Sequence, residues 1–84
     1  MNTEEMVAIF KNNSVPEYYY AVRTLGGGEC YGIQCDSGCW SIYYSERGRK
    51  TILSSYDNED SACFGLIDKI SKMMKDDFGL EIVM

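Results

Sequence analysis

The chain has 84 residues, of which 45% are hydrophobic, and it carries 13 acidic and 8 basic side chains but no histidine. This length suits a single domain spanning residues 1–84, and the apolar fraction argues against a disordered chain. The formal net charge of −5 disfavours nucleic-acid binding, and no apolar run approaches the roughly 18 residues of a membrane span. Because Glu4 and Glu5 stand where a secretory signal would be positively charged, we expect a cytoplasmic protein.

The first predicted element is a short helix near the N-terminus. Asn2 or Thr3 can cap its start, and the polar residues 12–14 followed by Pro16 end it. Its apolar face holds Met6, Val7, Ile9 and Phe10. A helix this short is marginal alone, so we expect it to dock on another element.

Residues 18–25 and 30–36 are the first two predicted strands. Strand alternation places Tyr18, Tyr20 and Val22 on one face of the first strand, and Tyr19, Ala21 and Arg23 on the other. Three glycines at 26–28 connect the two strands. A phosphate-binding loop would need a helix after the glycines, and a strand follows here, so that interpretation fails. In the second strand, the alternation predicts an inner face that carries Tyr31, Ile33 and Cys35.

The run from Trp40 to Gly48 predicts a central hairpin. Aromatic and β-branched residues alternate with serine and tyrosine, the period of two that a half-buried strand needs. Residues 36–38 precede this strand as a tight turn, and residues 46–48 follow it as another, each with a glycine suited to positive φ. Residues 49–56 can then return as a fourth strand. We expect Trp40 to anchor the core.

The last predicted element is a long helix capped by Asp57 or Asn58 and stopped at Gly79. Gly65 weakens this helix by roughly 1 kcal/mol relative to alanine, which close contact with another element would offset. Its apolar stripe consists of Cys63, Leu66, Ile67, Ile70, Met73 and Met74.

Together these elements predict a two-layer α+β domain of order α-β-β-β-β-α. The four strands form an antiparallel meander, and both helices cover one face. The other sheet face is then uncovered. The residues that we expect on that face and on the adjoining hairpin rim, as partner-binding candidates, are Tyr19, Arg23, Gln34, Tyr43, Glu46 and Arg47.

Four cysteines, at positions 30, 35, 39 and 63, leave three interpretations open. A zinc site would use cysteines in pairs two to four residues apart, and the distant Cys63 fits that spacing poorly. A disulfide framework is typical of secreted mini-proteins, which this sequence does not resemble. We favour reduced cysteines acting as small buried residues, and we expect no metal or cofactor.

Catalytic patterns are weak in this sequence. Histidine, the most common general base, is absent, and no activating base is implied near any cysteine. Carboxylate pairs such as Asp76 and Asp77 fall at helix ends, where solvated charge is usual. We therefore do not expect an enzyme. The acidic surface suits a basic protein partner, although it also serves solubility alone.

The run Trp40-Ser-Ile-Tyr-Tyr-Ser-Glu-Arg-Gly48, followed by Asp57-Asn-Glu-Asp-Ser-Ala-Cys63, resembles a pattern found in small bacterial immunity proteins. These are partners of polymorphic toxins, including contact-dependent growth inhibition systems, in which a W-x-V-Y-Y-S-E-R-G strand precedes an F-x-S/N-E-x-E-A-C helix start. The resemblance extends over about residues 6–70 and includes Val15-Pro16, Tyr20-Ala-Val and Glu29-Cys-Tyr. Ile42 replaces the usual valine, and Tyr56 replaces phenylalanine.

The resemblance implies a protein that binds a cognate toxin domain, frequently a basic nuclease, and covers its active site or substrate groove. Trp40, Tyr44 and Gly48 in the shared run are interpreted as residues that hold the fold. The alternative from another class is a self-associating or adaptor module that uses its sheet face or edge strand, without a toxin partner. A zinc-stabilised module is a third possibility.

Overall fold

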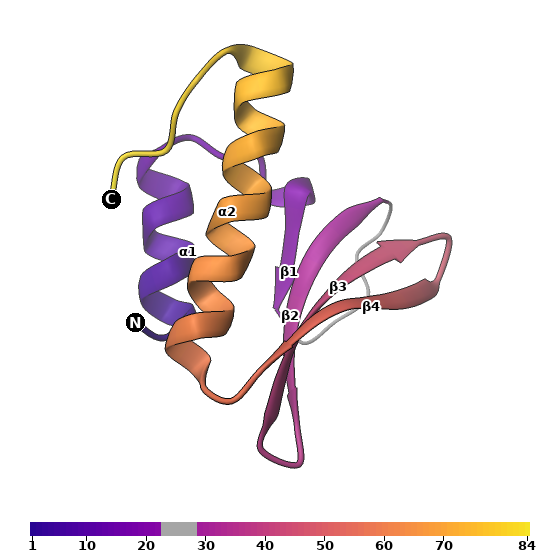
Figure 1. Cartoon of the computed structure of the whole chain (residues 1–84). Helices are drawn as coiled ribbons and strands as arrows, with labels where there is room; N and C mark the ends of the chain where they lie inside the picture. The colour runs from indigo at the N-terminus through magenta and orange to yellow at the C-terminus, as the bar shows by residue number, and fades with distance from the viewer. Residues whose placement is uncertain (23–28) are drawn as a thin grey trace.

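In the computed structural model, which describes residues 1–22 and 29–84, two α-helices lie on one face of a four-stranded sheet (Figure 1). The expected α+β class and the order helix, four strands, helix are confirmed. The elements are α1 (Thr3–Asn12), the 3-10 helix η1 (Glu17–Tyr19), β1 (Tyr20–Val22), β2 (Cys30–Asp36), β3 (Cys39–Glu46), β4 (Arg49–Tyr56) and α2 (Glu59–Phe78). The strands follow one another across the sheet in the order β1-β2-β3-β4.

The sheet is mixed, so the predicted all-antiparallel meander is wrong for one pair. β1 runs parallel to β2, with Tyr20 opposite Tyr31, whereas β2–β3 and β3–β4 are antiparallel.

Both hairpins close with a two-residue turn in which both central residues have positive φ. Ser37 and Gly38 have φ of 52° and 80°, and Arg47 and Gly48 have φ of 52° and 78°. This is the type I′ pattern, whose twist matches that of the flanking strands. The predicted positive φ at Gly38 and Gly48 is confirmed. The second turn is tighter than expected, because Glu46 still belongs to β3.

Side-chain caps fix the two helix starts where the sequence indicated. Asn2 and Glu5 form a capping box on α1, and Asn58 accepts a hydrogen bond from the Ser61 amide of α2. The two starts also meet in space: the Met1 ammonium lies 2.6 Å from Asp60 Oδ1. The hydrogen bond to this carboxylate raises the pKa of the α-amino group. The helices are thus joined at one end by charge as well as by apolar contact.

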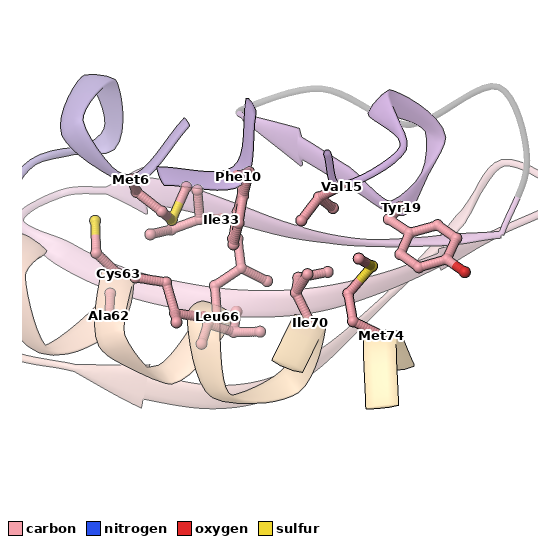
Figure 2. Close-up of a cluster of buried hydrophobic side chains, with 12 residues drawn as sticks. Met6, Phe10, Val15, Tyr19, Ile33, Ala62, Cys63, Leu66, Ile70 and Met74 are labelled. Atoms are coloured by element: carbon pink, nitrogen blue, oxygen red, sulfur yellow. The ribbon is translucent and has the colours of Figure 1, made fainter. Parts of the chain in front are cut away.

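A single apolar cluster lies between the helices and the sheet (Figure 2). Phe10 of α1 and Ile33 and Ile42 of the sheet are completely buried, and α2 contributes most of its predicted stripe. Trp40, expected as the core anchor, is only half-buried at the border of this cluster. The cluster consists of Met6, Phe10, Val15, Tyr19, Ile33, Ile42, Ala62, Cys63, Leu66, Ile67, Ile70 and Met74.

Gly65 of α2 packs tightly against side chains of β3 and β4. A Cβ at this position would lie 2.4 Å from the Tyr56 hydroxyl and 2.7 Å from Ile42 Cδ1. The expectation that Gly65 serves close contact is therefore confirmed, and Gly79 ends the helix with φ of 68°.

Beyond Gly79, the chain returns to α1. The Asn13 side chain donates to the Val83 carbonyl at 2.9 Å and accepts from the Val83 amide at 2.8 Å. One side-chain amide thus holds the final segment through the pair of bonds that a neighbouring strand would make.

Candidate protein-binding surface

One face of the sheet is turned away from both helices, and we call it the helix-free face (Figure 1). Its members follow from strand alternation, because Ile33 and Ile42 lie in the core and their neighbours must point the other way. The helix-free face is formed by Ala21 of β1, Cys30, Gly32 and Gln34 of β2, Ser41, Tyr43 and Ser45 of β3, and Lys50, Ile52 and Ser55 of β4.

Tyr43 lies on the helix-free face as predicted, but it is completely buried, which corrects its assignment as an exposed contact. Gly32 stands directly opposite it in β2. A Cβ on Gly32 would come 2.2 Å from the Tyr43 Cζ atom, so the ring covers the space that the glycine leaves. An aromatic ring that packs over a glycine on the neighbouring strand favours one strand register over the others. Tyr43 is therefore a structural residue.

Lys50 links two of the predicted residues on this face. Its ammonium lies 4.3 Å from the centroid of the Tyr43 ring, and it donates a 2.6 Å hydrogen bond to Gln34 Oε1. Gln34 is half-buried, and its strand β2 lies between β1 and β3 in the sheet. The sequence did not single out Lys50, because the inward face of residues 49–56 could not be assigned from a pattern with no clear alternation.

Tyr19 does not belong to the helix-free face, which corrects its prediction. It ends η1 rather than lying in a strand, and its ring is part of the core cluster beside α2. Its hydroxyl donates to Asp77 Oδ2 at 2.5 Å, and its ring stacks on Phe78 at 6.3 Å between centroids. The hydrogen bond to the Asp77 carboxylate and burial raise the pKa of Tyr19 to about 12.

The raised pKa of Tyr19 predicts a loss of stability in alkaline solution. The folded state favours the protonated phenol of Tyr19. The stabilisation that this phenol provides is therefore complete below pH about 10 and is lost as the pH rises through about 12. We expect Tyr19→Phe to reduce stability at neutral pH and to flatten the decline between pH 10 and 12, as measured by urea unfolding at a series of pH values. Tyr18→Phe, at the exposed neighbouring ring, serves as the control and should retain the wild-type decline.

Glu46 and Arg47 are exposed at the end of the β3–β4 hairpin, as predicted. Together with Gly48 and Arg49 they form a surface that we call the hairpin tip. Arg47 is the unusual member, because its φ of 52° lies in the left-handed region that glycine and asparagine favour. Arg23, the remaining predicted contact, lies outside the described residues.

β4 forms one edge of the sheet, and its apolar residues are open to solvent. Ile52 is 49% exposed and Leu53 is 42% exposed. Leu53 is the extra residue of a β-bulge, because Ser54 pairs with Ile42 and Ile52 pairs with the next residue, Tyr43. This shift in register is the reason that alternation in the sequence of β4 could not be read as one continuous pattern.

The cysteines divide into two pairs. Cys30 and Cys63 are buried, as expected of small apolar residues, whereas Cys35 and Cys39 are exposed near the β2–β3 turn, which corrects that part of the prediction. Burial raises the pKa of the Cys63 thiol to about 11, so it is protonated at neutral pH. Among residues 1–22 and 29–84, no group of three or more cysteine, aspartate or glutamate side chains is placed to hold a metal ion.

Within the described part of the chain, no helix combines the length and apolar character needed to cross a membrane. Searches of protein-family models, of curated proteins and of solved structures each find no match to this chain.

Proposed function

We propose that this chain is an immunity protein that binds the toxin domain of a bacterial effector and covers its active site or substrate groove. The resemblance of the run from Trp40 to Gly48 to such proteins supports the proposal. Within that run, Ile42 and Tyr43 are buried and Gly48 has φ of 78°, so these three serve the fold. Glu46 and Arg47 are exposed, and they are the members of the run that are free to contact a partner.

The observation that carries the proposal is the backbone of Arg47. A non-glycine residue in the left-handed region costs roughly 1 kcal/mol, and its side chain makes no hydrogen bond or ion pair with the described residues that would offset this. Ser37 has the same φ in the other type I′ turn, so what distinguishes Arg47 is a long charged side chain kept at a turn position that favours asparagine or glycine. Arginine is also among the residues that most often dominate protein interfaces.

The overall charge is consistent with a basic partner. With a net charge of −5, the chain attracts a nuclease domain whose substrate groove is built to bind phosphate. Long-range attraction of this kind raises the association rate, while the hairpin tip would provide the local contact. We place that contact on the hairpin tip and on the neighbouring exposed Lys50, which donates a hydrogen bond to Gln34.

The two hairpins provide a matched test. Ser37 and Arg47 occupy the same turn position with the same φ of 52°. We expect asparagine at either position to raise the free energy of unfolding by about 0.5–1 kcal/mol, because asparagine tolerates this conformation better. Only Arg47→Asn should weaken binding to the toxin domain, by at least about tenfold, or roughly 1.4 kcal/mol.

An immunity gene is expected to lie directly after the gene of a large secreted effector, so the partner for this test is the C-terminal domain of the effector that the proposal predicts at that position. Affinity is measured by calorimetry, and protection is measured by growth of cells that express the toxin domain. Equal affinities of Arg47→Asn and Ser37→Asn would remove the hairpin tip from the interface. If the wild-type chain neither binds this domain nor protects cells from it, the proposed function itself is wrong.

A further inference from the structure

The outer edge of β4 offers backbone groups to another strand. Within residues 1–22 and 29–84, no element pairs with this edge, because β4 ends the strand order. The strand has 8 residues, and Ile52 and Leu53 are exposed near its centre. An exposed strand edge with apolar residues is a template for pairing with a second chain.

Charge is distributed along this edge in a self-complementary way. Arg49 lies at the start of β4 and Asp57 directly follows its end, and both side chains are exposed. The apolar residues Ile52 and Leu53 lie between these two ends. An antiparallel copy of the same edge would therefore bring each basic end beside an acidic end, whereas a parallel copy would bring like charges together.

We propose that two copies of this chain associate through β4, antiparallel, about a twofold axis at Ile52–Leu53. The two sheets then continue into each other, and the apolar residues of one copy meet those of the other. Arg49 of each chain lies beside the end of β4 in its partner, where Asp57 is exposed. The same surface serves both chains, as a twofold interface requires.

Two features that usually protect a strand edge do not block this arrangement. Lysine on an edge strand commonly opposes pairing, but the ammonium of Lys50 is directed over Tyr43 to Gln34 on the helix-free face. The β-bulge at Leu53 lies at the twofold axis, so regular segments remain on both sides of it.

The test uses the purified chain alone, so its outcome is independent of the proposed toxin binding. Sedimentation equilibrium from about 1 µM to about 1 mM should show the mass rising from 9.6 kDa to twice that value. We expect Arg49→Asp and Asp57→Arg each to weaken association by at least about tenfold, and the double variant Arg49→Asp/Asp57→Arg to restore it.

The exposed aromatic residue Tyr18 provides the control surface. Tyr18 is 71% exposed and lies in η1, apart from β4 in the sheet order, so Tyr18→Ser should leave the dimer unchanged. A chain that stays monomeric at about 1 mM would overturn the proposal. A dimer that withstands both charge reversals, or that is lost in Tyr18→Ser, would show that another surface is used.

Discussion

Replacement of Gly32 by valine is expected to lower the free energy of unfolding by about 3 kcal/mol, as measured by urea unfolding followed by circular dichroism. The Cβ alone would lie 2.2–2.4 Å from the outer atoms of the Tyr43 side chain. Tyr43 is completely buried, so its ring cannot move aside without breaking other contacts. The preference of valine for strands, at most about 1 kcal/mol, is too small to compensate.

A second substitution at Tyr43 tests the cause of this loss. Tyr43→Ala alone should cost about 3–5 kcal/mol, because it empties the space over Gly32. In the double variant Gly32→Val/Tyr43→Ala, the valine fills part of that space, so the combined loss should be about 1–3 kcal/mol smaller than the sum. Strict additivity would contradict the proposed contact. Ser55→Val, at an exposed position of the adjoining strand, should change stability by no more than about 0.5 kcal/mol.

Phe10→Ala is expected to have the largest effect of any single change in the core, about 3–5 kcal/mol. Phe10 is completely buried between α1 and the sheet, and its ring lies 4.7 Å from that of Tyr20. With 10 residues, α1 cannot remain helical without this attachment. We expect a lower midpoint of urea unfolding in a single transition.

Phe64→Ala is the matched control, because Phe64 lies on α2 outside the apolar stripe and is 45% exposed. Its removal should cost less than about 1 kcal/mol. If the two alanine variants were equally stable, or if Phe10→Ala left amide protection in α1 unchanged, the assignment of α1 to the core would be wrong.

Local signals predicted the parts of this fold that depend on a few adjacent residues. Asn2 and Asn58 cap their helices because a short polar side chain can reach the free amides of the first turn. Gly38 and Gly48 mark the type I′ turns for a similarly local reason. These features need no knowledge of what lies across the molecule.

The features that were missed depend on distant residues. Tyr19 turns into the core because a 3-10 turn follows Pro16 and because Asp77, 58 positions later, accepts its hydroxyl. The Tyr43 ring lies over Gly32, which stands opposite it in β2 and leaves room for it. The direction of β1 is likewise set by its partner strand and not by its own side chains.

The candidate surface was predicted in outline and corrected in composition. The exposed tip at Glu46 and Arg47 follows from its place between two strands, which the sequence shows. Lys50 was not identified as part of the surface, because a β-bulge changes the face on which successive residues of β4 lie. A bulge is created by pairing with a neighbour, so a pattern within one strand does not reveal it.

Contacts at both ends of α1 connect this helix to segments that are distant in the sequence. At its start α1 is tied to α2 through Met1 and Asp60, and just past its end Asn13 holds the final segment at Val83. Segments that are remote along the chain thus meet at the two ends of the same short helix. Unfolding of α1 would release the start of α2 from Met1 and the final segment from Asn13 together, which favours a single unfolding transition.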